Sequence, residues 1–379
     1  MMKICMLLSN PFRPDPRVAR EALTLGEHGY KLTIACWDRM AEMDPYQRLS
    51  DNVEIIRIQS VRSSYGAGVK QIIRLPLFWR EAIRKIIPLK PEVIHCHDLD
   101  TLFIGWRLKR LTGCKLVFDA HDNYPELMAL YLPRLAIHVL DLWERFLLKK
   151  VDLMITASSY AVETYAAFTS CPIFAIRNFQ SLESYHSISP DEIKKARQSI
   201  GLKPEDYVIV YLGGFSLNRI LLPLIEAISG LPDVKLILWG DGHQKAAIQE
   251  AIINVPNSSY LGWAPANCVP LFTSLADVIY YCLKPNYPYN APNTLSNAML
   301  AGRPILATRV GDLGDIVEQT GCGLLLNEVT SETIRSSIEM MRDPALRKKL
   351  GQAGRIAAEC NYNWENEGKK LLSLYESLG

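Results

Sequence analysis

The chain has 379 residues and a formal net charge of +2, with 49% hydrophobic and 22% charged residues, a composition that suits a folded protein with room for two domains. It excludes a disordered or fibrous chain, and no apolar run approaches the roughly 18 residues of a membrane-spanning helix. The nine cysteines are scattered without a C-x-x-C pair or a zinc-type spacing, so we interpret them as core thiols of a cytoplasmic protein.

Short apolar runs rich in strand-forming residues alternate with helical segments along the first half of the chain. The N-terminal run is too short for a signal peptide and predicts a buried strand instead. Residues 17–28 and 134–150 have helical periodicity. Apolar strands separated by helices indicate a parallel sheet covered on both faces. The strands are expected at residues 3–9, 31–37, 53–59, 92–96, 115–119 and 152–157.

Residues 57–90 hold eight basic residues and one acid, Glu81, interleaved with Ile, Leu, Phe78 and Trp79. A basic amphipathic helix of this kind can lie on an anionic membrane surface, which would place the protein peripherally on the inner face of a membrane. The alternative is a helix with a solvated basic face and a buried apolar face. The sequence leaves both interpretations open. A basic excess confined to one segment argues against nucleic-acid binding.

A first cluster of titratable residues, HCHDLDTL, follows an expected strand at the edge where parallel sheets bind ligands. His95 and His97 lack a third ligand at a recognisable spacing, so no metal site is predicted. Asp98 or Asp100 is expected to cap the next helix.

A second cluster, LVFDAHDNYPEL, brings Asp119, His121, Asp122 and Glu126 to the end of the next expected strand. His121 would be placed there to donate a hydrogen bond to a ligand or to move a proton. The alternative is a structural histidine held by a neighbouring acid. The position at a strand end favours the functional interpretation.

The alternation restarts after a polar stretch at 177–199 that contains no strand signal, so the boundary between two doubly wound domains lies near 178–200. Two such domains facing a central cleft would suit a two-substrate reaction, with one site on each side. Residues 364–378 form a separate amphipathic helix. The strands of the second series are expected at residues 206–214, 234–240, 276–282 and 303–308.

Two turns of the second domain carry paired glycines after a strand. In YLGGFSLNR, Gly213 and Gly214 would let the backbone approach a ligand, and Arg219, interpreted as standing at the start of a helix, would pair with phosphate oxygens. In LILWGDGHQ, Gly240 and Gly242 stand at a second sharp turn. Neither turn has the spacing of a dinucleotide or P-loop motif, so ordinary loop glycines explain them equally well by spacing alone.

The stretch APNTLSNAMLAGRP predicts a helix that begins at Pro292, Asn293 and Thr294 and has a second amide, Asn297, one turn after Asn293. A helix N-terminus presents free N–H groups and a partial positive charge. It is therefore a natural seat for a phosphate or a carboxylate.

The order of these motifs resembles the retaining glycosyltransferases of the family-4 type, which have the GT-B architecture of two Rossmann-like domains facing a cleft. The resemblance covers nearly the whole chain, and it is specific through order and spacing rather than through any single motif. It implies an acceptor-side domain at 1–178, a donor-side domain at 179–362, and a terminal helix at 363–379 that crosses back to the first domain. It is carried by DPRVAREALTLGEHGY, HCHDLDTLFIG, KLVFDAHDNYPEL, YLGGFSLNR, LILWGDGH and APNTLSNAMLAGRPILATRVGDLGDIVEQTGCG.

The resemblance implies a UDP- or GDP-linked sugar as donor, with no cofactor and no metal. His121 matches the family histidine that contacts the donor sugar, and Arg219 matches the base that neutralises the diphosphate. Asn297 matches a glutamate that binds the ribose. The glycine turns and the helix start would then line the donor site, with the helix N-terminus beside the diphosphate.

The chain departs from the family pattern at the donor site. The usual two glutamates, with seven residues between them, are replaced by Tyr289 and Asn297. A branch with P-N-K-L-x-E-Y-M keeps the second acid, but this chain has Thr294 and Asn297 in place of its lysine and glutamate. The family has a second diphosphate-binding base just after the strand, and in this chain Gly214 occupies that position. An amide still hydrogen-bonds a ribose, and the loss of the charge would cost about 1.5–3 kcal/mol of binding.

The function expected from the resemblance is transfer of a sugar, with retention, to a glycan or lipid-linked acceptor in the synthesis of a cell-surface polysaccharide or glycolipid. The missing acids motivate one alternative, a catalytically impaired paralogue that binds a nucleotide-sugar or a partner subunit. A sugar-nucleotide epimerase is a second alternative, because such enzymes use the same two-domain fold.

Overall fold

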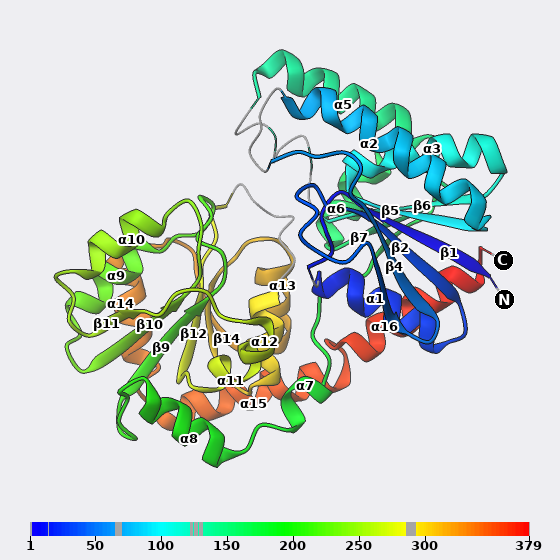
Figure 1. The fold of residues 1–379 in the computed structure, drawn as a ribbon. Coiled ribbons are helices and arrows are strands. Elements are labelled where there is room, and N and C mark those ends of the chain that lie inside the picture. The colour runs from blue at the N-terminus through cyan, green and yellow to red at the C-terminus, as the bar shows by residue number, and fades with distance from the viewer. Residues whose placement is uncertain are drawn as a thin grey trace. The chain divides into compact units, whose positions relative to one another are not determined.

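The computed structural model of the chain describes residues 2–13, 15–64, 70–121, 124, 128, 132–285 and 293–378. Its contacts separate the chain into two units, Met1–Ile176 with Gly368–Gly379, and Arg177–Glu367. Each unit is a sheet with helices on both faces (Figure 1). Among the described residues, no helix is both long enough and apolar enough to cross a bilayer.

The first unit contains a sheet of eight strands in the order β3-β4-β2-β1-β5-β6-β7-β8, in which all neighbours are parallel except β3 and β4. Parallel neighbours need a crossover between them. Helices provide it except between β2 and β4, where residues 38–52, including β3, make the connection. The strands are β1 (Lys3–Leu8), β2 (Lys31–Trp37), β3 (Tyr46–Ser50), β4 (Val53–Ile58), β5 (Val93–His97), β6 (Lys115–Ala120), β7 (Leu153–Thr156) and β8 (Ile173–Ala175).

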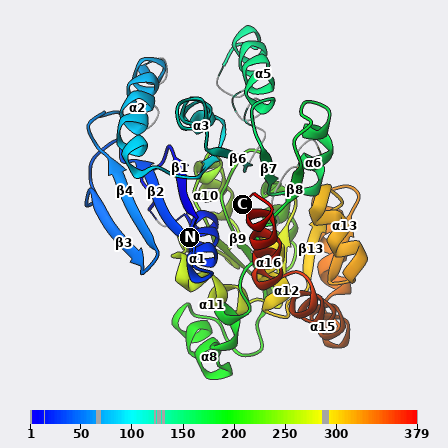
Figure 2. The ribbon, with the colours of Figure 1, turned by 90° about the vertical axis from the view of Figure 1, so that its right-hand side faces the viewer.

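Helices cover both faces of this sheet. Figures 1 and 2 show α2, α3 and α5 on one face, and α1 with the C-terminal part of α16 on the other. Helix α1 begins after Asp15, whose side chain accepts hydrogen bonds from the backbone N–H groups of Arg17 and Val18, and such a cap fixes a helix start. The helices are α1 (Pro16–Glu27), α2 (Lys70–Ile86), the 3-10 turn η1 (Ile87–Leu89), α3 (Leu99–Thr112), α5 (Arg134–Leu148), α6 (Ser159–Ala166) and α16 (Trp364–Glu376).

The second unit contains a sheet of six parallel strands in the order β11-β10-β9-β12-β13-β14. These are β9 (Tyr207–Leu212), β10 (Val234–Trp239), β11 (Ser258–Tyr260), β12 (Val278–Tyr281), β13 (Ile305–Thr308) and β14 (Gly323–Leu326).

In Figure 1, α9, α10 and α14 lie on one side of this second sheet and α11, α12 and α15 lie on the other. Its helices are α7 (Glu183–His186), α8 (Pro190–Ser199), α9 (Leu222–Ser229), α10 (Lys245–Ile252), the 3-10 turn η2 (Ala266–Cys268), α11 (Val269–Ser274), α12 (Asn293–Leu300), α13 (Gly311–Thr320), α14 (Ser331–Met340) and α15 (Pro344–Cys360).

The expected pair of doubly wound α/β domains is confirmed, and each of the ten expected strands forms. Four further strands, β3, β8, β11 and β14, were not expected. All are short, and β3, β8 and β11 carry no fully buried residue, so they lack the apolar run by which a central strand is recognised. The cysteine interpretation holds for six buried thiols, but Cys171 and Cys268 are half-buried and Cys360 is exposed.

The basic segment 57–90 forms the end of β4, α2 and η1, with residues 65–69 outside the described part. Phe78 is fully buried and stacks on Trp37 at 4.6 Å between ring centroids. The indole N–H of Trp79 donates to the carbonyl of Asp100 at 2.9 Å. Helix α2 therefore buries Phe78 and half-buries Trp79, while the basic residues Arg74, Arg80, Arg84 and Lys85 are exposed.

Candidate active site

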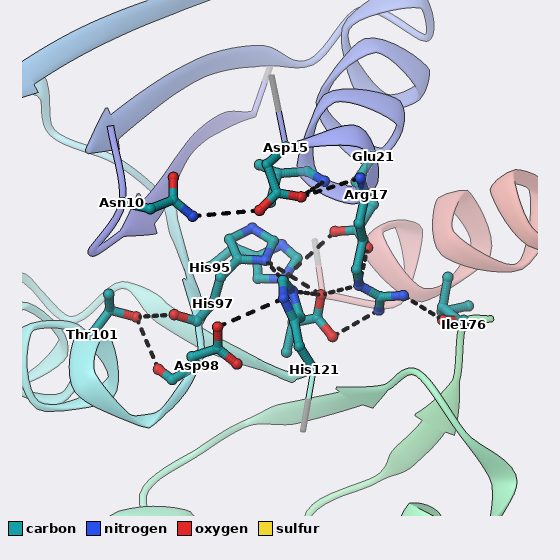
Figure 3. A network of polar contacts seen from close by, with 12 residues as sticks. Asn10, Asp15, Arg17, Glu21, His95, His97, Asp98, Thr101, His121 and Ile176 are labelled. Carbon is teal, nitrogen blue, oxygen red and sulfur yellow. Dashed lines mark hydrogen bonds and ion pairs between the residues drawn. The ribbon is translucent and has the colours of Figure 1, made fainter. Parts of the chain in front are cut away.

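Arg17 of α1 and Asp119 of β6 form a buried ion pair at the carboxyl end of the first sheet (Figure 3). The guanidinium donates to both carboxylate oxygens, at 2.8 Å from Nε and 2.7 Å from Nη2. Its Nη1 donates to the carbonyl of Ile176 at 2.7 Å. Both side chains are at most 3% exposed. A planar, two-bond pair in a dry setting fixes the carboxylate in one orientation.

His121 lies between two carboxylates (Figure 3). Its Nε2 is 3.1 Å from Oδ2 of Asp119, and its Nδ1 is 3.7 Å from Oδ2 of Asp98. Burial opposes the charged ring, but Asp98 and Asp119 outweigh burial and raise the pKa of His121 to about 10. The imidazole is therefore a cation at neutral pH. With 19% of its side chain exposed, it can donate a hydrogen bond to an anionic ligand, but it has no free base form to accept a proton.

The neighbouring histidines are neutral. The rings of His95 and His97 stack at 4.3 Å between centroids, and burial lowers the pKa of both. Nδ1 of His97 lies 3.1 Å from Nε2 of His121. Burial also raises the pKa of Glu21 to about 8, against the attraction of Arg17. The charged groups of the cluster are thus Arg17, Asp98, Asp119 and His121.

Asp98 has a strained backbone, with φ 62° and ψ 161°. Non-glycine residues in such regions cost about 1–3 kcal/mol, and they occur where the surrounding structure holds a functional group in place. Asp98 stands at the N-cap position of α3, as expected, but within the described residues its side chain makes no capping hydrogen bond and instead faces Nδ1 of His121. Asp100 lies inside the first turn of α3, where an acid interacts favourably with the helix dipole.

Donor atoms of Glu21, His95, His97 and Asp119 lie within 4.8 Å of one another, as the ligands of a metal ion would. The positive charge beside the two carboxylates is already the guanidinium of Arg17, which bonds Asp119 and approaches Glu21 at 3.1 Å. A divalent cation added to this group would meet that charge in a site closed to water. We therefore assign the cluster to positioning His121 rather than to metal binding.

In the second unit, the two glycine turns pack against each other at the ends of β9 and β10. A Cβ on Gly240 would lie 2.1 Å from the carbonyl oxygen of Gly213, and one on Gly242 would lie 2.9 Å from that of Phe215. These contacts account for Gly240 and Gly242 by packing alone. Gly214 differs, since a Cβ there would meet no atom of the described residues within 4 Å, which leaves open space beside the backbone in this part of the structure.

Arg219 lies in a turn that pairs with Leu283 as an isolated β-bridge. It does not start a helix as expected, because α9 begins at Leu222. Its guanidinium carbon is 4.7 Å from the ring centroid of Tyr281. Arg219 also lies close enough to Tyr211 to affect its hydroxyl: burial raises the pKa of Tyr211, and the positive charge of Arg219 offsets part of that rise. Since the Tyr211 hydroxyl donates to the carbonyl of Gly214 at 2.7 Å, the base lies near the open turn.

The helix expected at 292–301 is α12, which starts at Asn293; Pro292 and Tyr289 lie outside the described residues. Asn293 is exposed, and the Thr294 hydroxyl donates to the carbonyl of Leu212 at 3.4 Å. The first turn of α12 therefore lies at the end of β9, beside the glycine turn.

Asn297 is 8% exposed, and its Oδ1 accepts a hydrogen bond from the hydroxyl of Tyr185 at 2.7 Å. The acceptor oxygen that the resemblance assigns to the ribose thus already has a partner within the unit. A ligand would have to share or displace that hydrogen bond.

Comparison with known proteins identifies the family of this chain. A model of the Glycosyltransferase Family 4 domain matches residues 17–183, and a model of the Glycosyl transferases group 1 domain matches residues 192–357. The chain is a glycosyltransferase. The two matches follow one another in chain order and leave only short segments uncovered.

The glycosyltransferase is 23% identical over 301 residues to sulfoquinovosyl transferase SQD2 of Arabidopsis thaliana, a match that covers 76% of this chain and 57% of that protein. Among solved structures it is similar to sucrose-phosphate synthase of Thermosynechococcus elongatus, with a TM-score of 0.83 and 19% identity over 100% of this chain and 99% of that one. HepE of Anabaena, solved with UDP-glucose, gives a TM-score of 0.76 at 17% identity over 100% of both chains. At these identities the structures show the shared GT-B fold.

The structure adds three residues of the glycosyltransferase to the cluster around His121 that the sequence analysis did not single out. Arg17 and Glu21 stand four apart on the buried face of α1, and a charged pair at that spacing on the apolar side of a helix is a signal that could have found them. Tyr375 has no such signal, because its contact with His95 joins distant parts of the chain.

Proposed function

We propose that the glycosyltransferase moves a sugar from a nucleotide-diphosphate sugar to a glycan or lipid-linked acceptor, in the synthesis of a cell-surface polysaccharide or glycolipid. The observation that carries the proposal is the convergence of the open Gly214 turn, Arg219 and the first turn of α12 in the second unit. A phosphate-binding site needs accessible backbone, a fixed cation and a helix N-terminus, and all three are present. The UDP-glucose held by HepE supports the class of donor.

The proposed role of these residues is to stabilise the leaving diphosphate. As the bond between sugar and phosphate breaks, negative charge develops on the phosphate oxygens. A preorganised guanidinium and helix N–H groups stabilise that charge without reorganising at the moment of reaction. Retention of the anomeric configuration, with attack by the acceptor hydroxyl on the face that the leaving group departs from, is part of the proposal. The scheme assigns no metal and no cofactor.

His121 is proposed, from the resemblance, to contact the donor sugar. Its raised pKa supports a donor of hydrogen bonds rather than a general base. Nε2 of His121 is hydrogen-bonded to Asp119, whereas Asp98 lies 3.7 Å from Nδ1, at ion-pair distance. The two acids would keep the imidazolium in one orientation and leave its Nδ1–H to donate to the sugar. Loss of either acid would therefore change both the charge and the position of the ring.

The acceptor side of the proposal includes peripheral attachment to the cytoplasmic face of a membrane through residues 57–90. The exposed basic side chains of α2 supply the attraction to anionic lipid, at about 1 kcal/mol for each residue near the surface. The attached enzyme would then encounter a lipid-linked acceptor at the membrane surface.

The proposal is tested by thermal shift and calorimetric titration with UDP, GDP and their common sugar conjugates. A ligand that binds only the folded state must raise the melting temperature. We expect one nucleotide to do so, and Arg219→Ala to remove the shift. Arg309→Ala is the matched control, because Arg309 is an exposed base of the same unit that pairs with Glu318. If no nucleotide at millimolar concentration shifts the wild type, the donor site is not functional and the impaired-paralogue alternative holds.

A further inference from the structure

Helix α5 presents an apolar stripe to solvent. The exposed fractions are 76% for Leu135, 59% for Val139, 54% for Leu142 and 42% for Phe146. Their spacing of four, three and four residues places them on one side of the helix. These four residues are called the outer stripe below.

The opposite side of α5 carries a buried carboxyl group. Glu144 is 4% exposed and accepts a hydrogen bond from the Tyr165 hydroxyl at 3.1 Å. Trp143 packs against Phe103 of α3 at 5.6 Å between ring centroids. A surface helix normally turns its apolar residues inward. Helix α5 does so with Leu147 and Leu148, which are fully buried, but it also exposes the four apolar residues of the outer stripe. A contiguous exposed stripe of this kind indicates a contact with something other than water.

Cationic side chains border the outer stripe. The ammonium of Lys150 is 5.4 Å from the ring centroid of Phe146. Trp106 contacts the same ring edge-on at 5.6 Å, and the guanidinium of Arg110 lies 5.5 Å over Trp106. Arg134 and Lys149, at the two ends of the helix, are exposed. The acid Asp141 is paired with Arg145 at 2.9 Å, so its charge is offset locally.

We infer that the outer stripe enters the headgroup and acyl boundary of an anionic bilayer, with Arg110, Lys149 and Lys150 at the level of the lipid phosphates. Apolar residues flanked by bases, with an indole between them, match the layering of such an interface. The inference rests on the membrane attachment in the proposed function, and it names α5 rather than α2 as the helix that inserts. Helix α2 supplies charge but buries Phe78, whereas α5 supplies the apolar residues that insert.

A second copy of the chain fits the outer stripe less well than a bilayer does. In a two-fold contact the stripe meets itself, so Lys149 and Lys150 of one copy would lie against the same bases of the other if the two helices run parallel, and against Arg134 of the other if they run antiparallel. Like charges brought together at an interface oppose association. The phosphate headgroups of a bilayer would instead neutralise Lys149 and Lys150.

The test is flotation of the full chain with vesicles of anionic lipid and with vesicles of neutral lipid. We expect binding to the anionic vesicles, and we expect the triple variant Leu135→Ser, Val139→Ser, Leu142→Ser to bind them at least about tenfold more weakly, because three apolar side chains no longer leave water. The matched control is Ile253→Ser, Met340→Ser, Ile356→Ser. It removes three apolar side chains of the second unit that are 74%, 60% and 62% exposed, and it should bind as the wild type does.

Equal binding of the triple variant and the wild type would overturn the inference. A wild-type dimer in light scattering that becomes a monomer in the triple variant, without binding to vesicles, would also overturn it in favour of a second copy. Melting temperature with and without donor is measured on the same samples, so a failure of the proposed donor site is seen separately from a failure of the stripe to bind lipid.

Discussion

The hydroxyl of Tyr375 lies 2.6 Å from Nδ1 of His95, although the two residues are 280 positions apart in the chain. Both side chains are fully buried. The last helix therefore contributes to the cluster that surrounds His121, through the stacked ring of His97. The far end of the chain is part of the support of the candidate histidine.

Tyr375→Phe should destabilise the protein by about 1–3 kcal/mol, because it leaves a buried ring nitrogen without its partner. Urea unfolding measures this. Tyr30→Phe is the control, since the half-buried ring of Tyr30 packs on Tyr375 at 6.1 Å and its hydroxyl is replaced without cost to His95. Equal effects of the two variants would show that the hydrogen bond contributes little.

Arg17→Met should cost about 3–5 kcal/mol, because Asp119 is then a buried carboxylate without its bidentate partner. The exposed pair of Arg309 and Glu318 provides the comparison, and Arg309→Met should cost at most about 1 kcal/mol. Adding Asp119→Asn to Arg17→Met should recover part of the loss. A buried pair that behaves like the surface pair would contradict this account of the cluster.

Stability should fall as pH rises from about 6.5 to 10, and His121 should be one of the causes. Its pKa is raised to about 10 when folded, above the ordinary value of about 6.5. The stabilisation is fully present below the unfolded pKa and is lost as pH rises through the folded one, with a slope of at most about 1.4 kcal/mol per pH unit for one proton. Unfolding of His121→Gln across this range should show a shallower slope, and an unchanged slope would refute the assignment.

Gly240→Ala should be strongly destabilising, since its methyl group would lie 2.1 Å from the carbonyl oxygen of Gly213. Gly214→Ala should leave the melting temperature within about 2 °C of the wild type, because no atom lies near the added carbon and a surface change of this kind costs at most about 0.5 kcal/mol. If Gly214 lines the donor site, Gly214→Val should fold but bind the nucleotide more weakly. Donor binding by Gly214→Val at wild-type affinity would remove Gly214 from the proposed site.

Asn297→Glu should tighten binding of the nucleotide by about one to two decades, if Asn297 faces the ribose as proposed, because a charged acceptor hydrogen-bonds more strongly than an amide. Tyr185→Phe provides the companion variant. It releases Oδ1 of Asn297 from its internal hydrogen bond and should also tighten binding, by less. Calorimetric titration measures both. No gain in either variant would place the ribose elsewhere.

Much of the fold follows from local sequence. Strands such as β1 and β9 are continuous apolar runs that bury nearly every residue, and such runs separated by helices specify a parallel sheet. Short edge strands such as β11 cannot be predicted in this way, because their pairing depends on an existing neighbour rather than on their own side chains.

The sequence predicts the positions of some candidate residues but not the contacts of others. His121 and Arg219 follow strands, and the edge to which a parallel strand delivers its last residue is a property of the chain order. The role of Asp98 could not be predicted, because its strained backbone and its approach to His121 depend on the packing of β5 against β6. The same holds for the Tyr185 hydroxyl on Asn297, which joins α7 to α12.

The sequence by itself determined the two largely parallel sheets, the family and the strand ends at which the candidate residues stand, because periodicity and motif order are local properties. Only the tertiary structure decided which groups are charged and which side chains are exposed. The protonation of His121 depends on two carboxylates, Asp119 in β6 and Asp98 just after β5, and the outward direction of Leu135 and Leu142 depends on which side of α5 packs against α3. Both arise from contacts between segments that no local pattern connects.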